Sequence, residues 1–269
     1  MRTAVTVCLV PEARQGPFVL HDGLAAGCVA AAAAGYDGVE VFPPGAESLG
    51  GGEVRRLLAA HGLELAAVGT GAGWLVHQLH LCHADSSVRD RARRFIAEMI
   101  DAAGELGAPA IIGSMQGRSS PGVSREAALG HLADALHDLA SRAARHGQSL
   151  LYEPLNRYET DLFNHQAEAA AFLDTRGLHG VRLLCDLFHM NIEEADVAAT
   201  LVACGRRVGH VHWADSNRRA MGLGHTAAGP VIAALEAIGY EGWLSAEVFP
   251  LPSAAVALRQ TIASIRPAG

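Results

Sequence analysis

Ala-Ala-Gly-Glu-Leu-Gly-Ala-Pro-Ala-Ile-Ile-Gly, residues 102–113, contains the pattern that decides the fold. An Ala-rich helical stretch stops at Gly107, and a short apolar run follows it directly. The same glycine stop recurs after the helical stretches that end at Gly35 and Gly62. Glycine is the residue that most often ends a helix, because it adopts the left-handed backbone conformation freely. Helices that stop just before apolar runs predict parallel strands joined by helical crossovers.

This alternation runs from one end of the chain to the other. Strands are predicted at about 3–9, 37–42, 63–69, 108–113, 149–153, 181–186, 207–212 and 243–247. Helices are predicted at about 22–34, 52–61, 87–106, 124–146, 165–175, 194–204, 228–238 and 253–266. Strand–helix units without a linker or a break in composition favour a single-domain α/β fold over 1–269, a closed (β/α)8 TIM barrel. The alternative, a doubly wound open sheet, needs a glycine-rich phosphate turn after the first strand, and residues 10–16 lack one.

Composition excludes several classes of function. The net charge is −7 and no basic block stands out, which argues against nucleic-acid binding. The apolar run at 4–10 is too short for a secretion signal, and no stretch reaches transmembrane length. The 5 cysteines are scattered, without a Cys-x-x-Cys pair, which is typical of reduced thiols. We therefore expect a soluble cytoplasmic protein.

Each of the last four predicted strands before the final helix ends in an ionisable residue. These residues are Glu153, Asp186, His212 and Glu247. The carboxyl ends of barrel strands form one mouth, where the active sites of such barrels lie, so we expect the four side chains to meet there. Carboxylates packed together repel one another unless a cation lies among them. Oxygen ligands with one imidazole indicate a divalent metal, Mn²⁺ before Mg²⁺ or Co²⁺.

Three segments in this part of the chain carry a resemblance to a known family. They are Glu-Pro-Leu-Asn-Arg-Tyr-Glu-Thr (153–160), Asp-Leu-Phe-His-Met-Asn-Ile-Glu-Glu (186–194) and His-Val-His-Trp-Ala-Asp-Ser-Asn-Arg (210–218). The chain resembles the xylose-isomerase-like sugar isomerase/epimerase superfamily, and within it the ketose 3-epimerases (D-tagatose or D-psicose 3-epimerase) and keto-sugar-acid epimerases. The similarity covers most of the chain and is strongest over 107–252.

The resemblance implies a metal-dependent isomerase of carbohydrate metabolism. Glu153, Asp186, His212 and Glu247 match the metal ligands of those epimerases, and Glu153 and Glu247 also match their two acid/base carboxylates. The implied reaction is proton transfer beside the carbonyl of a ketose or keto-sugar acid, through a metal-stabilised enediolate. Two carboxylates on opposite faces of the reacting carbon suit epimerisation, with C3 the favoured position.

The same resemblance assigns residues to the substrate. Glu159, His189 and Arg218 match groups that hold substrate oxygens near the reacting carbons. The implied partner is a small-molecule sugar, with no nucleic acid or membrane, and relatives of this kind are often homodimers or homotetramers. Arg218 stands next to Arg219, and one of the two is expected to be a solvated loop charge.

The loop after the third predicted strand departs from the family pattern. It reads Gly-Thr-Gly-Ala-Gly-Trp over 69–74, where keto-sugar-acid epimerases of this type carry Gly-Thr-Gly-Gln. Trp74 is either a lid that stacks on the sugar or a core anchor. Arg118, after the fourth strand, is either an anchor for a substrate carboxylate or a surface charge. The residues leave the identity of the sugar open.

Other functions share the same barrel. An aldose–ketose isomerase of the hydroxypyruvate-isomerase kind and an inosose-dehydratase-like lyase would start from the same enediolate. A DNA-repair endonuclease with three zinc ions would need His and Asp ligands on the earlier strands, which end in Leu9, Phe42, Gly69 and Gly113. A sugar-binding protein without catalysis would not need paired glutamates.

Overall fold

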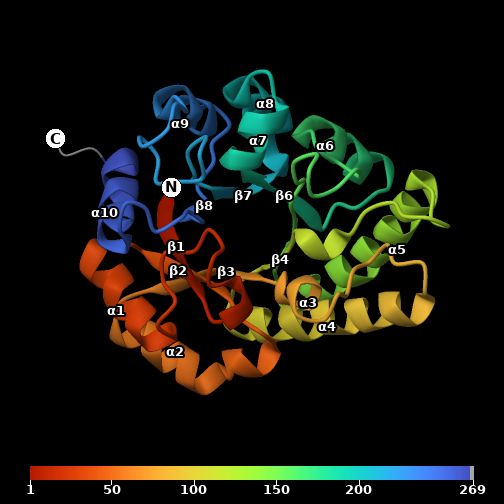
Figure 1. Ribbon diagram of the computed structural model, residues 1–269, viewed down its shortest axis with the longest axis horizontal. Helices are drawn as coiled ribbons and strands as arrows, with labels where there is room; N and C mark the ends of the chain where they lie inside the picture. Colours follow the sequence, from red (N-terminus) through yellow and green to blue (C-terminus); the bar gives the residue numbers. More distant parts are fainter. Residues whose placement is uncertain (267–269) are drawn as a thin grey trace.

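The computed structural model describes residues 1–266 and contains one closed barrel of parallel strands inside a ring of helices (Figure 1). The strands are β1 (Arg2–Cys8), β2 (Gly38–Phe42), β3 (Glu64–Gly69), β4 (Ala110–Ile112), β5 (Leu150–Tyr152), β6 (Val181–Asp186), β7 (Val208–His212) and β8 (Trp243–Ala246). Each strand pairs with its neighbours in sequence order, and β8 closes the barrel on β1. The predicted TIM barrel is confirmed. The one-domain prediction extends to residues 267–269, which lie outside the described residues.

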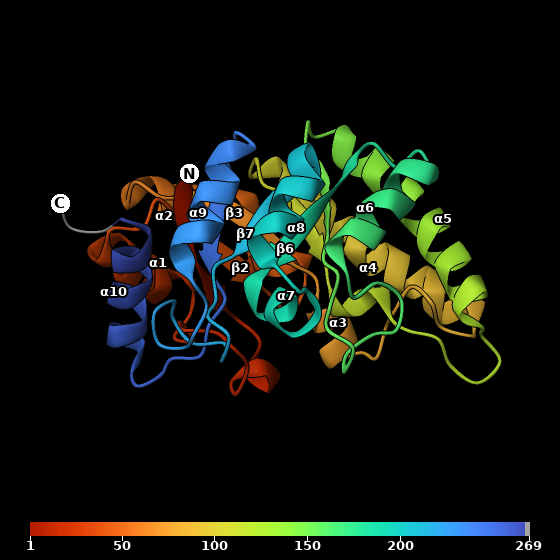
Figure 2. The same cartoon turned by 90° about the horizontal axis from the view of Figure 1, so that it is seen from above.

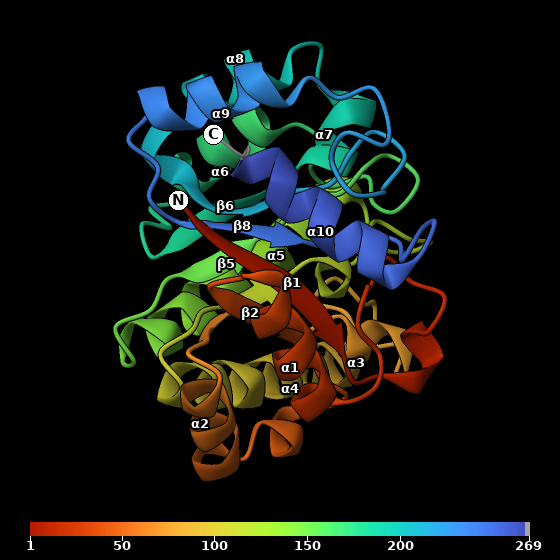
Figure 3. The same cartoon turned by 90° about the vertical axis from the view of Figure 1, so that its left-hand side faces the viewer.

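The α-helices alternate with the strands and cover the outside of the barrel. They are α1 (Leu24–Ala34), α2 (Gly51–Ala60), α3 (Ala72–Leu75), α4 (Ser86–Glu105), α5 (Arg125–Ala144), α6 (Gln166–Thr175), α7 (Leu187–Glu193), α8 (Val197–Cys204), α9 (Ala228–Ala237) and α10 (Ala254–Ile265). Short 3-10 helices are η1 (Pro11–Ala13), η2 (Ala46–Leu49), η3 (Ser114–Gln116) and η4 (Gly205–Arg207). Figure 3 shows α1 and α10 beside β1, so the last helix packs against the first unit of the barrel.

The predicted strands and main helices agree with these bounds to within about three residues. Glycine ends α1 as predicted, because Gly35 has φ +87° and its N–H donates to the carbonyls of Ala31 and Ala32. The short helices α3 and α7 were not predicted. Each begins within three residues of the end of a strand, at the mouth of the barrel, and helices of 4 and 7 residues leave little periodicity to detect. Figure 2 shows α3 and α7 at the same end of the molecule.

Side chains fill the barrel interior beneath this mouth. Ala67, Ile111, Leu151 and Leu184 form one buried cluster, contributed by four adjacent strands. Because side chains alternate along a strand, Leu151 lies one layer below Glu153, and Leu184 lies one layer below Asp186. On the side of β3–β6 the interior is therefore a packed apolar floor under a polar mouth.

Candidate metal and catalytic site

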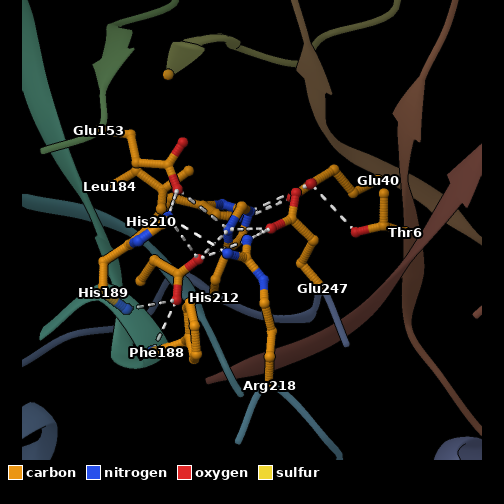
Figure 4. A network of polar contacts seen from close by, with 12 residues as sticks. Thr6, Glu40, Glu153, Leu184, Phe188, His189, His210, His212, Arg218 and Glu247 are labelled. Atoms are coloured by element: carbon orange, nitrogen blue, oxygen red, sulfur yellow. Dashed lines mark hydrogen bonds and ion pairs between the residues drawn. The ribbon is translucent and has the colours of Figure 1, made fainter. Parts of the chain in front are cut away.

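The four strand-end residues meet around the imidazole of His212. Its Nδ1 atom lies 3.4 Å from Asp186 Oδ2, 3.5 Å from Glu247 Oε2 and 3.6 Å from Glu153 Oε1. Asp186 and His212 are the last residues of β6 and β7, while Glu153 and Glu247 directly follow β5 and β8. Figure 4 shows Glu153 and Glu247 reaching the His212 ring from different sides. The side chains that the strand pattern singled out therefore form one cluster.

Glu153 fits into this cluster because Gly113, which follows the neighbouring strand β4, has no side chain. A Cβ atom on Gly113 would lie 2.3 Å from Glu153 Oε2, so only glycine leaves space for the carboxylate. Below it, the Gln116 side-chain amide donates to the Glu153 carbonyl at 2.9 Å. Burial, together with the charges of Glu247 and Asp186, raises the pKa of Glu153 well above its ordinary value, although His212 opposes this. Burial among these carboxylates thus favours the protonated form of Glu153.

Asp186 uses its two oxygens for different purposes. Oδ1 accepts the backbone N–H of Phe188 at 2.8 Å and so caps α7. Oδ2 faces His212 and accepts a hydrogen bond from Arg218 at 3.2 Å. Its complete burial opposes ionisation, but the neighbouring His189, Arg218 and His212 outweigh burial and hold the pKa of Asp186 below its usual range. Asp186 is therefore an ionised carboxylate whose Oδ2, beside the His212 ring, could bind a cation in place of its contact with Arg218.

His212 has one ring nitrogen fixed by a residue that sequence reasoning missed. Its Nε2–H donates to Glu40 Oε1 at 3.2 Å, and His210, one layer below, donates to Glu40 Oε2 at 2.8 Å. Thr6 donates to the same carboxylate at 3.2 Å. These partners hold the pKa of Glu40 below its ordinary value despite its burial. In the sequence, Glu40 is a lone charge inside the apolar strand 38–42. The prediction considered only the last residue of each strand and therefore did not include Glu40.

This arrangement tests whether a metal fits. With Nε2–H donated to Glu40, Nδ1 faces three carboxylate oxygens at 3.4–3.6 Å, and Glu40 and Glu247 outweigh burial and raise the pKa of His212 well above its ordinary value, which favours a proton on Nδ1 as well. A divalent cation among these carboxylates would take the place of that proton and balance their negative charge. Ligand atoms of Glu153, Asp186 and His212 all lie within 4.8 Å of one another. These three donors fit a divalent cation, while Glu247, whose Oε2 lies 3.5 Å from Nδ1, is outside that group and accepts a hydrogen bond from Arg218.

A second group of potential ligands, Glu40, His210 and His212, is equally close. Its atoms already satisfy one another, because both imidazoles donate to the Glu40 carboxylate at 2.8 and 3.2 Å. A metal there would have to replace these hydrogen bonds. This group is better described as the support of His212, in the manner of carboxylates that orient ligating histidines.

His189 lies in the first turn of α7, and its ring is buried among the site residues. Its Nδ1 accepts from the side-chain amide of Asn156 at 2.7 Å and from the Asn156 backbone N–H at 3.4 Å. Burial, with Arg218 nearby, lowers the pKa of His189 to about 4, although Asp186 acts in the opposite direction. The neutral ring therefore carries its proton on Nε2, which lies 3.8 Å from Glu153 Oε1 and faces the cavity.

Arg218 is placed by the loop that follows β7. This loop wraps around buried Asp215, whose carboxylate accepts the backbone N–H groups of Gly222, Gly224 and Thr226 at 2.7–2.9 Å. Arg218 has φ +57°, in the left-handed region, and its N–H donates to the Asp215 carbonyl at 2.8 Å. Its guanidinium lies 4.8 Å from the Phe188 ring centroid. The neighbouring Arg219 is exposed, so Arg218 is the one of the pair that reaches the site.

The guanidinium of Arg218 donates to both Asp186 and Glu247. Burial opposes its charge, but the two carboxylates outweigh burial and raise the pKa of Arg218. It therefore supplies a permanent positive charge at the cavity wall. Glu159, the third residue assigned to the substrate, has a side chain that is 45% exposed, and it accepts from Asn156 Nδ2 at 3.0 Å.

These residues line a cavity of about 420 Å³ at the mouth of the barrel. Glu153, His212 and Glu247 are part of its wall, together with Glu159, His189 and Arg218. Phe42, Gly69 and Gly113, from the first half of the barrel, complete it. The residues predicted for catalysis and for substrate binding therefore all line this cavity.

No helix within residues 1–266 combines the length and apolarity needed to cross a bilayer.

Several known proteins are similar to this chain. A family model described as xylose isomerase-like TIM barrel matches residues 28–267. L-Ribulose 3-epimerase of Mesorhizobium japonicum is 32% identical over 170 residues, which are 62% of this chain and 57% of that protein. The aligned part is thus little more than half of the length of this relative.

Solved structures share the whole fold. D-Allulose 3-epimerase from Methylomonas sp. superposes with a TM-score of 0.82 at 24% identity, covering 99% of this chain and 97% of that chain. The 3-keto-D-glucoside 4-epimerase of Escherichia coli superposes with a TM-score of 0.83 at 23% identity, covering 100% of both chains. At this level of identity the likeness establishes a common architecture.

Proposed function

The chain belongs to the xylose isomerase-like TIM-barrel family, and from this premise we propose that it is a divalent-metal-dependent sugar epimerase. The substrate is a ketose or keto-sugar acid, and the reaction moves a proton on the carbon beside the carbonyl, with C3 epimerisation favoured. One observation carries the proposal: an imidazole nitrogen faces three carboxylates at 3.4–3.6 Å, at the wall of a cavity of about 420 Å³. The names of the relatives, ketose 3-epimerases and a keto-glucoside 4-epimerase, support the same chemistry.

Glu153, Asp186, His212 and Glu247 are the proposed metal ligands. Three carboxylates with one imidazole are a hard, oxygen-rich set that favours Mn²⁺, with Mg²⁺ or Co²⁺ as alternatives. When bound, the ion supplies positive charge that stabilises the enediolate oxygen of the substrate.

Glu153 and Glu247 are the proposed acid and base. Inversion requires that a proton leave one face of a carbon and return to the other, and these two carboxylates reach the His212 ring from different sides (Figure 4). Burial, with Glu247 and Asp186 nearby, raises the pKa of Glu153, which favours a carboxyl that can donate a proton as well as accept one.

Three further residues are proposed to hold the substrate. The Nε2–H of neutral His189 donates to a hydroxyl or carbonyl oxygen, and the guanidinium of Arg218 balances the negative charge that develops on oxygen. Glu159, partly exposed at the cavity wall, accepts from a substrate hydroxyl.

The proposal is tested by incubating the metal-loaded protein with a panel of ketoses and keto acids in deuterated buffer. NMR should show deuterium entering at the carbon beside the ketone, together with the epimeric product. An aldose product would indicate an isomerase instead, and loss of water would indicate a lyase. Absence of deuterium exchange in every ketose and keto acid would contradict the proposed chemistry.

The metal ligands are tested separately from the reaction. Asp186→Asn and His212→Ala should lose bound metal and activity together, since neither residue has an acid or base role. Asp138→Asn, which alters an exposed carboxylate paired with Arg93, is the matched control and should keep both. Full metal occupancy in the Asp186 and His212 variants, by elemental analysis, would refute the ligand assignment.

A further inference from the structure

A second chamber of about 260 Å³ adjoins the cavity at the carboxylates. The two spaces share the walls formed by Trp74, Ser114, Leu155 and Glu159. Glu153, which contacts the reacting part of a substrate in the proposed reaction, lines the first cavity only. A substrate whose reacting carbons lie beside Glu153 in the first cavity can therefore place its remote part in the second chamber.

Trp74 forms the wall between the two spaces. It lies on α3, which packs close to the barrel because residues 71 and 73 are glycines. A Cβ atom on Gly71 would lie 2.8 Å from Phe42, and a Cβ atom on Gly73 would lie 2.5 Å from Met115. The Trp74 side chain remains 38% exposed, so it is not a core anchor. A large aromatic ring held open beside a cavity is typical of a binding platform.

Two further aromatic rings line the second chamber. His80 is buried and meets Trp74 edge-on, with ring centroids 5.5 Å apart. Burial and the neighbouring His83 lower the pKa of His80 to about 4, so the ring is neutral. Tyr158 is 77% exposed. The chamber thus offers neutral aromatic surfaces on which the flat, apolar face of a sugar ring can stack.

The polar groups of the chamber carry opposite charges. Arg118 and Glu159 both line it. Arg118 is exposed, so the donors of its guanidinium can reach a ligand in the chamber. A positively charged donor beside a negatively charged acceptor binds the hydroxyls of a neutral sugar ring better than it binds an anion.

We propose that the second chamber is a subsite for a second sugar ring, so that the substrate is a ketose carrying a glycosyl group on the carbons remote from its ketone. Trp74 is the stacking platform, and Arg118 and Glu159 contact the hydroxyls of the added ring. This inference rests on the proposed function, because the ketone end must lie beside Glu153 and Glu247.

The test compares two sugars with the same reacting part: D-fructose and isomaltulose, which is fructose with a glucosyl group on O6. Their open-chain fractions differ, so the measured quantity is the ratio of kcat/KM for isomaltulose to that for fructose, in each variant. Trp74→Ala should lower this ratio about fivefold, the loss of one stacking contact. Val76→Ala is the matched control, since Val76 is 37% exposed on the adjacent turn but lines neither space. It should leave the ratio unchanged.

A direct binding measurement separates the two proposals. Trp213 and Trp243 are buried, so quenching of tryptophan emission by iodide reports on exposed Trp74. Isomaltulose should protect Trp74 from iodide at lower concentration than fructose does. Equal protection by both sugars, or an unchanged kcat/KM ratio in Trp74→Ala, overturns the subsite while leaving the epimerase proposal intact. Protection of Trp74 by isomaltulose supports the subsite even where neither sugar exchanges hydrogen, and the epimerase proposal is then decided by the wider panel of ketoses and keto acids.

Discussion

The two halves of the barrel place different side chains at its mouth. The strands β5–β8 end at or next to Glu153, Asp186, His212 and Glu247, whereas β1–β4 end in apolar or small residues. The first half forms open walls of the cavity through Phe42, Gly69 and Gly113, and the second half supplies the charges. Charge and space thus come from opposite halves, which keeps the carboxylates together and leaves room for a substrate beside them.

The division is not complete, because the first half also supports the second. Glu40 reaches from β2 across the barrel to His210 and His212, and Gly113 leaves the space that Glu153 Oε2 occupies. Variants in the two halves therefore separate groups that carry the chemistry from groups that position them.

The largest expected effect lies in the charged half. Glu153→Gln and Glu247→Gln each keep an oxygen ligand but cannot accept a proton, so epimerisation should fall by about 10²–10⁴-fold. Elemental analysis should find most of the metal retained, and NMR in deuterated buffer should find hydrogen exchange limited to one epimer for each variant. A near wild-type rate of epimerisation in either variant would refute the two-base mechanism.

Gly113→Ala tests whether the first half positions the second. The added Cβ would lie 2.3 Å from Glu153 Oε2, so the carboxylate must move, and kcat should fall on the order of 10²-fold. Gly130→Ala in α5 is the matched control, because nothing lies within 4 Å of its added Cβ. Circular dichroism and thermal unfolding of both variants distinguish a displaced carboxylate from an unfolded chain. Equal kcat in the two glycine variants would show that Gly113 does not position Glu153.

Glu40→Gln removes the charge that orients His212 from the other half. Its metal affinity should fall by about 10–100-fold, as is usual when the partner of a ligating histidine is changed. Calorimetric metal titration gives this affinity directly, without reference to activity. Glu64→Gln, on the exposed end of β3, should bind metal like the wild type. An unchanged affinity in Glu40→Gln would assign Glu40 to packing alone.

The smallest effect expected is that of pH on metal binding. In the metal-free protein, Glu40 and Glu247 outweigh burial and raise the pKa of His212 well above its ordinary value, and the pKa of Glu153 is also raised. Both groups are therefore protonated toward lower pH and must release protons to bind metal, so affinity and activity fall on acidification. The expected loss is about tenfold or less per pH unit for each proton released. Added Mn²⁺ should partly restore activity, and calorimetry in buffers of different ionisation enthalpy counts the protons.

The loop around Trp74 shows where sequence reasoning stops. The glycines at 69, 71 and 73 indicated an unusual turn, but whether Trp74 faced the core or the cavity depended on how α3 packs against Phe42 and Met115. In the same way, the sequence left Arg118 as either an anchor for a substrate carboxylate or a surface charge. Only the fold shows that Arg118 lines the second chamber. Both questions concern contacts between segments that are separate in the chain.

The sequence by itself determined the barrel and the four strand ends that carry the charges. These features are local: helix periodicity, glycine stops and the last residue of a strand all lie within a few positions of one another. The tertiary structure decided the rest. Glu40 meets His210 across 170 residues of chain, and the second chamber joins loops from three strands. No local pattern encodes such contacts, because the closure of the barrel alone determines which interior side chains face one another.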